Sequence, residues 1–404
     1  MTQASSITLP QPADSAPWWA RPLIAAAQRL EAGSIALTFP GGATLTLAGP
    51  RPGPCADITI VHPRAVRRLV LEGDIGLAKG YRDGDWESRD LVALIELASR
   101  NDAAVRSAAT GLGPWRLWHR ALHRLHANSR AGSRRNIMAH YDLGNDFYAR
   151  WLDETMTYSS ALFTPATHTL PDAQHAKYDR LMDTLDLSTG DTVLEIGCGW
   201  GGFAERAARR GVQVTGLTLS PTQLAYARER LSRAGLDSRA DLRLQDYRDV
   251  EGTYDRVASI EMFEAVGEQH WPQFFATVRD RLRPGGIAAI QVITIADERF
   301  SRYRQEADFI QRLIFPGGML PSERAFVNGA EAAGLKVDDV FRFGADYART
   351  LNHWARAFRS AEPTLAEMGF DNAFSRLWAF YLAYCEAGFR AGSIDVVQIR
   401  LVRP

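Results

Sequence analysis

Cysteine is scarce and long apolar runs are absent in this chain of 404 residues. Its three cysteines, Cys55, Cys198 and Cys385, are too few for a disulfide framework and too far apart for the ligand spacing of a metal site. No run is apolar for long enough to span a bilayer, and the Ser-, Pro- and Ala-rich residues 1–22 lack the apolar core of a signal peptide. These absences predict a cytosolic protein with reduced thiols and no metal site.

Net charge is also absent, because Lys plus Arg and Asp plus Glu both number 47. Targeting by charge would therefore depend on local patches, and residues 103–141 form one because they contain no acidic residue. Within this stretch Arg116, Arg120 and Arg124 share one helix face, with Trp and Leu interleaved. The pattern predicts a helix that contacts an anionic membrane surface. A neutral chain with one basic helix lacks the positive surface that is typical of nucleic-acid-binding proteins. The alternative to membrane contact is a solvated linker helix.

Glycine, by contrast, gathers at residues 191–203, which read D-T-V-L-E-I-G-C-G-W-G-G-F. The apolar run 192–196 is typical of a buried parallel strand, and the glycines after it open a helix. Glycines let a ligand approach the backbone, the helix N-terminus offers free N–H groups, and Glu195 can meet a cationic amino group. These features suit S-adenosylmethionine (SAM) better than a pyrophosphate. A tight strand-to-helix turn in another α/β enzyme is the alternative.

Strand and helix patterns alternate beyond this turn, which predicts a doubly wound, mostly parallel α/β sheet with helices on both faces. The further strands expected are 212–217, 242–245, 254–260 and 287–295, with an antiparallel pair at 335–343 and 394–401. A charged helix is expected at 297–313. The N-terminal part reads as a smaller α+β domain, with strands at 35–39, 43–47 and 58–61, loops at 49–54 and 80–86, and helices at 65–72 and 91–99.

A series of motifs in this order resembles the cyclopropane-fatty-acyl-phospholipid synthases and their mycolic-acid relatives, which are class I SAM-dependent methyltransferases. They include H-Y-D-L-G-N-D-F-Y from His140, M-T-Y-S-S from Met156, V-L-E-I-G-C-G-W-G-G from Val193, M-F-E-A-V-G from Met262 and F-G-A-D-Y from Phe343. Each motif alone is weak, but together they are specific. The resemblance implies a lipid-engaging domain at 1–110, a basic linker helix at 111–139 and a SAM-dependent methyltransferase domain with inserted lid helices at 140–404.

The resemblance also carries roles over to individual residues. Those that would bind SAM are Tyr158, Ser159, Glu195, Gly197, Gly199, Gly201, Thr218, Gln223, Asp246 and Tyr247. Those that would surround a bound bicarbonate, which accepts a proton in this family, are Ser160, Glu264, Gln291 and Tyr347. Among the first group, Gln223 would contact the ribose or amino group, and Asp246 and Tyr247 would flank the adenine. Tyr158 and Ser159 would close over the methionine end.

Two positions in the bicarbonate group depart from the family pattern. The family usually has Cys at position 160 and His at position 291, where this chain has Ser160 and Gln291, and Ala265 replaces a frequent His. Ser and Gln keep hydrogen-bonding capacity but lack a titratable thiol or imidazole. We therefore expect bicarbonate to be held loosely or not at all, with Glu264 or Tyr347 accepting the proton instead.

The chemistry of a double bond explains why the proton acceptor matters. A C=C bond is a weak nucleophile, so it must be held in line with the methyl group, and methyl transfer leaves a carbocation that aromatic faces can stabilise. The aromatic candidates are Phe263, Tyr347, Trp354, Trp378, Phe380 and Tyr381, with core packing as the alternative for most. Loss of a proton from the new methyl group gives a cyclopropane, and loss from a neighbouring carbon gives a methyl-branched alkene. Glu264 is the candidate base, and a helix-start or salt-bridge carboxylate is its alternative.

The main hypothesis is a SAM-dependent C-methyltransferase that acts on unsaturated acyl chains of phospholipids. It would be a cytoplasmic protein, peripheral on the inner membrane face and often a homodimer in this family, and its product would be a methyl-branched unsaturated chain rather than a ring. The alternatives are a bicarbonate-dependent cyclopropane synthase proper, a small-molecule C- or O-methyltransferase with an accessory domain, and an inactive lipid-binding protein that keeps the pocket. Neither nucleic acid nor metal is expected.

Overall fold

The computed structural model describes residues 17–108 and 143–404, and these divide into two compact units. One unit contains the described residues up to 108 together with Phe370–Ala391, and the other contains residues 143–369 and Gly392–Pro404. Helix α15 (Asn372–Arg390), which the sequence analysis assigns to the methyltransferase domain, therefore groups with the N-terminal strands. The basic stretch that includes Arg116, Arg120 and Arg124 lies outside the described residues.

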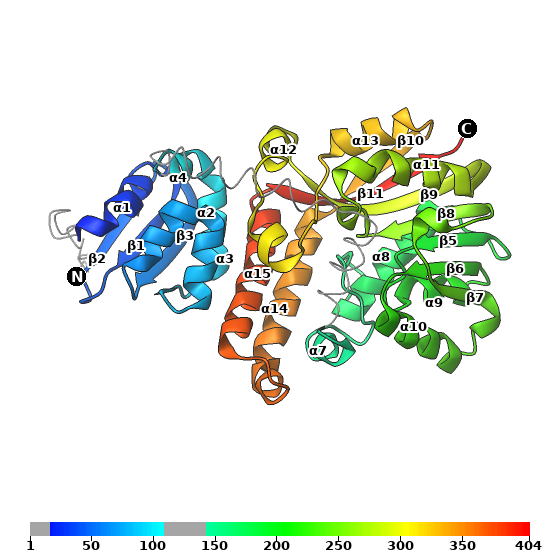
Figure 1. Ribbon diagram of the computed structural model, residues 1–404, viewed down its shortest axis with the longest axis horizontal. Coiled ribbons are helices and arrows are strands. Elements are labelled where there is room, and N and C mark those ends of the chain that lie inside the picture. The colour runs from blue at the N-terminus through cyan, green and yellow to red at the C-terminus, as the bar shows by residue number, and fades with distance from the viewer. Residues whose placement is uncertain (1–16, 109–142) are drawn as a thin grey trace, which may run out of the picture. The chain divides into compact units, whose positions relative to one another are not determined.

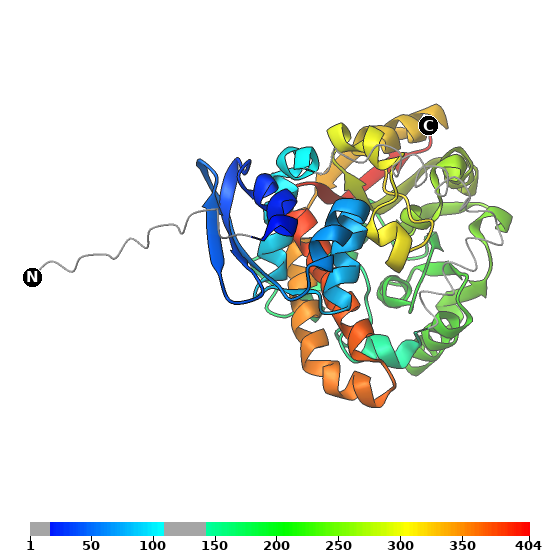
Figure 2. The ribbon, with the colours of Figure 1, turned by 60° about the vertical axis from the view of Figure 1, so that its left-hand side comes forward.

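The first unit is an α+β structure built on a four-stranded sheet in the order β2-β1-β3-β4 (Figures 1 and 2). Its strands are β1 (Ala32–Thr38), β2 (Thr44–Ala48), β3 (Arg51–Ile60) and β4 (Trp86–Glu87). Its other helices are α1 (Arg21–Ala27), α2 (Arg64–Arg82), α3 (Leu91–Arg100) and α4 (Asp102–Ala108), and α15 packs against α2 and α3. Gly41 and Gly42, both with positive φ, lie in the hairpin turn between the antiparallel strands β1 and β2.

Two predicted loops in this unit are largely wrong. The expected loop at 49–54 is mostly strand, because β3 begins at Arg51 and pairs in parallel with β1 from there. Its prolines are tolerated because β4 pairs with β3 only at Thr59 and Ile60, so this end of β3 has a free edge. The expected loop at 80–86 is helical to Arg82, because α2 continues past a kink at Gly73, where φ is 62°.

The second unit has the predicted doubly wound sheet, in the order β10-β11-β9-β8-β5-β6-β7. Five strands are parallel: β5 (Thr192–Ile196), β6 (Gln213–Thr218), β7 (Ala240–Leu244), β8 (Tyr254–Ile260) and β9 (Leu282–Ile295). The edge pair is β10 (Lys336–Arg342) and β11 (Ile394–Val402), and β11 runs antiparallel to both of its neighbours. The class I methyltransferase fold expected from the sequence is thus confirmed, including its antiparallel edge.

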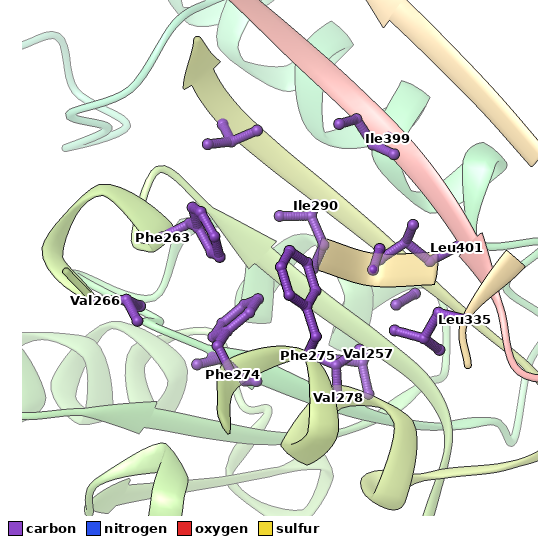
Figure 3. Close-up of a cluster of buried hydrophobic side chains, with 14 of the residues drawn as sticks. Val257, Phe263, Val266, Phe274, Phe275, Val278, Ile290, Leu335, Ile399 and Leu401 are labelled. Carbon is purple, nitrogen blue, oxygen red and sulfur yellow. The ribbon is translucent and has the colours of Figure 1, made fainter. Parts of the chain in front are cut away.

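Helices cover both faces of this sheet, which is why its central strands are apolar on both sides (Figure 1). One face packs against α8 (Leu170–Thr184), α9 (Gly202–Arg209) and α10 (Pro221–Arg233). The other packs against α11 (Trp271–Arg281) and α13 (Glu323–Ala332). Figure 3 shows the second core, where Phe263 lies beside Phe274 and Phe275, with ring centroids 5.0 and 5.4 Å from its own. Phe263 therefore anchors the loop after β8 in the core.

The inserted segment after β9 differs from the single helix expected at 297–313. Helix α12 (Asp297–Tyr303) ends early, and a separate π-helical turn follows at Ile310–Ile314. The break has a local cause, because Asp308 Oδ1 accepts from the backbone N–H of Gln311 at 2.9 Å and so begins a new turn. Helix α14 (Gly344–Glu367) then leads away from β10. Among the described residues, no helix combines the length and apolar character needed to cross a bilayer.

Candidate active site

The glycine turn after β5 leaves room for a ligand at one position. Gly197, Gly199 and Gly201 all have positive φ, at 89°, 51° and 81°. The turn is tied to β6, because the N–H groups of Gly197 and Cys198 both donate to the carbonyl oxygen of Leu217, at 3.0 and 2.8 Å. A Cβ at Gly197 would lie 2.8 Å from Met262 Cγ, whereas a Cβ at Gly199 would meet no atom of the described part of the chain within 4 Å. Gly197 is therefore needed for packing, and Gly199 borders open space.

Glu195, the second-last residue of β5, is a buried carboxylate with an unsatisfied oxygen. The residue is 2% exposed, and its Oε2 has no hydrogen-bond partner among the described residues. Burial raises the pKa of Glu195 to about 8, although Lys177 and Arg230 act in the opposite direction. A buried carboxylate oxygen without a donor costs free energy unless a ligand supplies one. Together with the open side of Gly199, it fits the cationic amino group of SAM.

The next two strands place the other predicted cofactor residues at the same sheet edge. After β6, the Oγ1 of Thr218 donates to Oε1 of Gln223 at 3.2 Å, and both residues are buried. After β7, the carboxylate of Asp246 accepts two bonds from the guanidinium of Arg248, at 2.8 and 2.5 Å. Tyr247 packs edge-on against Phe274, with ring centroids 5.6 Å apart. Because Arg248 already engages both oxygens of Asp246, this carboxylate is oriented before any ligand binds.

Residues 145–158 lie against the glycine turn. Asn145, in α7 (Asn145–Ala149), accepts at Oδ1 from the indole Nε1 of Trp200 at 2.8 Å. The ring of Tyr148 lies 5.1 Å from Trp200 and 5.4 Å from Tyr158, measured between centroids. Residues 140–142 are outside the described residues, and residues 145–158 bring Tyr158 to the aromatic cluster beside this turn.

Lys177 of α8 is a buried cation that the sequence analysis missed. It is fully buried, and its Nζ donates to Oγ of Ser159 at 2.6 Å. Burial lowers the pKa of Lys177 to about 7, opposed by the negative charges of Glu261, Asp153 and Glu195. Lys177 therefore interacts electrostatically with the cofactor half of the site, through Glu195, and with the opposite half, through Glu261.

In that opposite half, the residues predicted to hold bicarbonate surround a carboxylate of the chain itself. Oε1 of Glu261 accepts from the backbone N–H of Ser160 and from Nε2 of Gln291, both at 2.8 Å. Oε2 of Glu261 accepts from the hydroxyl of Tyr347 at 2.6 Å. Ser160, Gln291 and Tyr347 are all buried. The structure thus brings three of the four predicted residues together around Glu261, which was not predicted.

A relay of side chains fixes the orientation of Gln291. Arg180 donates to Oε1 of Gln398 at 3.0 Å, and Nε2 of Gln398 donates to Oε1 of Gln291 at 3.0 Å. Gln291 and Gln398 are also cross-strand partners in β9 and β11. Because arginine can only donate, the direction of every bond in this relay is determined. The amide N–H of Gln291 must therefore point at Glu261.

Glu264, the predicted base, lies next to this cluster. Its Oε1 accepts from the N–H of Ile293 at 2.6 Å, and its Oε2 is buried with no partner in the ranges that the structure describes. Burial, reinforced by the charge of Glu261, raises the pKa of Glu264 to about 8. Among the described residues, no group of three His, Cys, Asp or Glu side chains is arranged to hold a metal.

The sequence did contain a signal for Glu261, because a charged residue directly follows the apolar strand predicted at 254–260. The carboxyl ends of parallel strands are where ligands bind in such sheets.

Of the aromatic candidates, Phe263 belongs to the core and Trp378, Phe380 and Tyr381 lie on α15 of the first unit. Trp354 remains beside the site, with its ring 5.3 Å from Tyr158 and 6.1 Å from Tyr347.

Comparison with known proteins identifies relatives of this chain. Residues 128–399 match the mycolic acid cyclopropane synthetase family. The tuberculostearic acid methyltransferase UfaA1 of Mycobacterium tuberculosis is 42% identical over 91% of this chain and 88% of its own length. The cyclopropane-fatty-acyl-phospholipid synthase of Escherichia coli is 36% identical over 85% of this chain and 87% of its own.

This chain belongs to the mycolic acid cyclopropane synthetase family. Among solved structures, the mycolic acid cyclopropane synthase CmaA1, complexed with SAH and CTAB, is 32% identical with a TM-score of 0.62, over 67% of this chain and 98% of that one. The cyclopropane synthase MmaA2 from Mycobacterium tuberculosis gives the same values. The family membership and the fold that were predicted from the motifs are confirmed, and the chain is an enzyme of this family.

Proposed function

We propose that this protein is a SAM-dependent methyltransferase that adds a methyl group to the double bond of an unsaturated phospholipid acyl chain. The observation that carries the proposal is the pairing, at one sheet edge, of an open glycine turn beside an unsatisfied Glu195 with a buried carboxylate cluster around Glu261. The first half suits a cationic methyl donor, and the second suits removal of a proton. Such a combination is what methylation of an alkene requires.

The cofactor half divides the binding tasks among its residues. Gly199 would allow close approach of SAM to the backbone, and Glu195 would pair with its amino group. Thr218 and Gln223 would contact the ribose or amino group, and Asp246 and Tyr247 would flank the adenine. Tyr158 and Ser159 would close over the methionine end, where Lys177 fixes the hydroxyl of Ser159. When bound, SAM supplies an electrophilic methyl group on a sulfonium.

The proton-acceptor half favours a methyl-branched unsaturated product over a cyclopropane. Ser160, Gln291, Glu264 and Tyr347 line this half, and neither Ser160 nor Gln291 offers a titratable group. A related protein at 42% identity is named a tuberculostearic acid methyltransferase, and one at 36% is named a cyclopropane synthase, which supports the same distinction. Bicarbonate-dependent ring closure is the second candidate, favoured by the 36% relative.

The decisive experiment supplies SAM with a trideuterated methyl group to purified protein and vesicles of unsaturated phospholipid. Ring formation removes a proton from the transferred methyl group, so a cyclopropane would keep two deuterium atoms, whereas a methyl-branched alkene would keep all three. Mass spectrometry reads the label, and reaction with dimethyl disulfide confirms a remaining double bond. Retention of only two deuterium atoms, in a product that forms no dimethyl disulfide adduct, would overturn the proposed product. Failure to label any acyl chain, with SAM binding shown by calorimetry, would favour a small-molecule methyltransferase.

We also propose a peripheral position on the inner face of the membrane, with the protein itself in the cytoplasm, because the acyl substrate lies in the bilayer. The basic stretch with Arg116, Arg120 and Arg124 supports this proposal by its sequence. Reversing these three charges should weaken sedimentation with anionic vesicles, and added salt should weaken it in the parent. Unchanged vesicle binding would leave the stretch a linker. The homodimer implied by the resemblance is checked by sedimentation equilibrium.

A further inference from the structure

The carboxylate of Glu261 lies where the family resemblance implies a bound bicarbonate. Three of the four residues assigned to that anion, Ser160, Gln291 and Tyr347, donate hydrogen bonds to Glu261 instead. We propose that Glu261 is the proton acceptor of this enzyme, and that a carboxylate of its own chain replaces an exogenous anion. This inference rests on the proposed function, the methylation of a double bond.

Glu261 and a bicarbonate ion would compete for the same donors. Both present two oxygens of a planar, singly charged carboxylate-type group. The backbone N–H of Ser160 and the hydroxyl of Tyr347 each have one hydrogen, and both hydrogens point at Glu261. The relay from Arg180 through Gln398 directs the amide of Gln291 at the same carboxylate. An added anion would find these donors already occupied.

The backbone of Glu261 indicates that the side chain is held there at a cost. Its φ is 50°, in the left-handed region that a residue with a Cβ adopts only at a cost in free energy. The surroundings enforce the conformation, because the N–H of Glu261 donates to the carbonyl oxygen of Gln291 at 2.8 Å and Phe263 is buried in the core nearby. Backbone strain of this kind clusters at active sites. Glycine would adopt the same conformation freely, so the carboxylate itself is the feature that this position retains.

The hydrogen bonds also identify the atom that would accept the proton. Oε1 of Glu261 accepts two bonds and Oε2 accepts one, which leaves a lone pair on Oε2. Methyl transfer forms a C–C bond to one alkene carbon as the S–C bond breaks, and the sulfur keeps that electron pair. A C–H bond next to the resulting cation then supplies the electron pair of the new double bond, and its proton passes to Oε2 of Glu261. The neutral carboxyl returns this proton to water when the product leaves.

The competing interpretation is that Glu261 only holds Gln291 and Tyr347 in place. Glu261→Gln separates the two roles, because the amide keeps the shape of the side chain. Its oxygen can still accept from Ser160 and Gln291, and its NH₂ group can donate to Tyr347, whose hydroxyl also accepts. A structural role would therefore survive in Glu261→Gln, but the capacity to accept a proton would not.

The test measures methyl transfer from SAM to vesicles of unsaturated phospholipid, in CO₂-free buffer and with added bicarbonate or formate. We expect the parent to be indifferent to both anions. Glu261→Gln should lose on the order of 10²-fold or more in kcat, as expected for removal of a general base, with the Kd for SAM unchanged in calorimetry. Glu251→Gln, which removes an exposed carboxylate on the same unit, should match the parent.

Glu261→Gly sharpens the test, because it opens a space the size of a carboxylate and relieves the left-handed backbone. Bicarbonate or formate should raise the kcat of this variant at least about tenfold, which is within the range of general-base catalysis. They should not restore Glu261→Gln, whose amide still fills the space. Bicarbonate labelled with ¹³C should also bind Glu261→Gly by NMR in the absence of lipid, and should not bind the parent.

The outcomes separate this inference from the proposed function. A parent that transfers no methyl group to any unsaturated lipid would overturn the proposed function, and the assignment of Glu261 with it. A parent that methylates lipid only with added bicarbonate would overturn the assignment alone. The same holds for a Glu261→Gln variant that keeps its kcat, and for a Glu261→Gly variant that binds SAM but neither binds nor responds to either anion.

Discussion

Two buried carboxylates of the active site, Glu195 and Glu261, differ in how completely the described part of the chain satisfies them. Oε2 of Glu195 is buried without a partner among the described residues, whereas both oxygens of Glu261 accept hydrogen bonds. A buried polar atom left unpaired costs about 1–3 kcal/mol. The contrast teaches that Glu195 needs a ligand to satisfy its second oxygen, whereas Glu261 is already held by donors of the chain itself.

The largest expected effect follows from filling the open side of the glycine turn. Gly199→Val should abolish SAM binding in calorimetry, because its side chain would enter space that no protein atom occupies. Valine is also strained at a φ of 51°, so some loss of stability is expected in addition. Gly235→Val is the matched control, since Gly235 has a φ of 67° and also borders open space, but at the end of α10. If Gly199→Val binds SAM as well as Gly235→Val does, the SAM-binding site lies elsewhere.

Local pattern was enough to predict the strand, glycine turn and helix from residue 192 to 209, but not the residues that surround Glu261. The turn from Glu195 to Gly201 is contiguous, so its strand, glycines and helix can be read from neighbouring residues. Glu261, Gln291 and Gln398 lie on or directly after three different strands and meet only through the register of the sheet. Lys177 lies on a helix and resembles any surface lysine in sequence, yet it is fully buried. Such contacts depend on the tertiary fold, which sequence periodicity does not specify.

The fold was predictable for a related reason. Alternating strands and helices specified the sheet and its antiparallel edge, because each element has its own apolar period. The grouping of α15 with the N-terminal strands could not be read in this way, since nothing in an amphipathic helix says which core it joins. The strand at Arg51–Ile60 was missed at its start because prolines there suggested a loop.

Glu195→Gln should have the next largest effect, a loss of about 10–100-fold in SAM affinity, because a hydrogen bond to a charged group contributes about 1.5–3 kcal/mol.

The free energy of unfolding of the parent should also depend on pH through Glu195. The pKa of Glu195 is about 8 in the folded protein against an ordinary 4.5, so between these values the unfolded chain has lost a proton that the folded chain keeps. The free energy of unfolding of the parent therefore falls as pH rises through this range, by up to about 1.4 kcal/mol per pH unit.

The amide variant at position 195 lacks this dependence. The difference in free energy of unfolding between Glu195→Gln and the parent, measured by urea denaturation without cofactor, should favour the variant more near pH 8 than near pH 5. A parallel pH dependence in parent and variant would mean that Glu195 is ionised in the folded protein, and that an unseen donor already satisfies its Oε2.

A smaller effect is expected for Tyr347→Phe, which removes the donor that the described residues supply to Oε2 of Glu261. Burial raises the pKa of Glu261, and the hydrogen bond from Tyr347 opposes this rise, so its loss should raise the pKa further and move the acidic limb of the kcat profile to higher pH. On that limb the loss should be about tenfold, and it should shrink as pH rises. Tyr384→Phe, which removes a hydroxyl bonded to Asp74 on the first unit at 3.2 Å, should leave the profile unmoved. A uniform loss at all pH values would assign Tyr347 a purely positional role.

The smallest effect is expected where the family pattern would suggest the largest. Ser160→Cys combined with Gln291→His restores the residues usual in the family, but the N–H at position 160 and a ring N–H at position 291 can still donate to Glu261. A neutral histidine also offers one acceptor nitrogen to Gln398, so the direction of the relay is kept. With its carboxylate in place, the double variant should remain independent of bicarbonate and form the same trideuterated product as the parent. Adding Glu261→Gly should make the triple variant require bicarbonate. A double variant that needs bicarbonate while Glu261 is intact would show that side chains at 160 and 291, rather than the carboxylate at 261, decide where the proton goes.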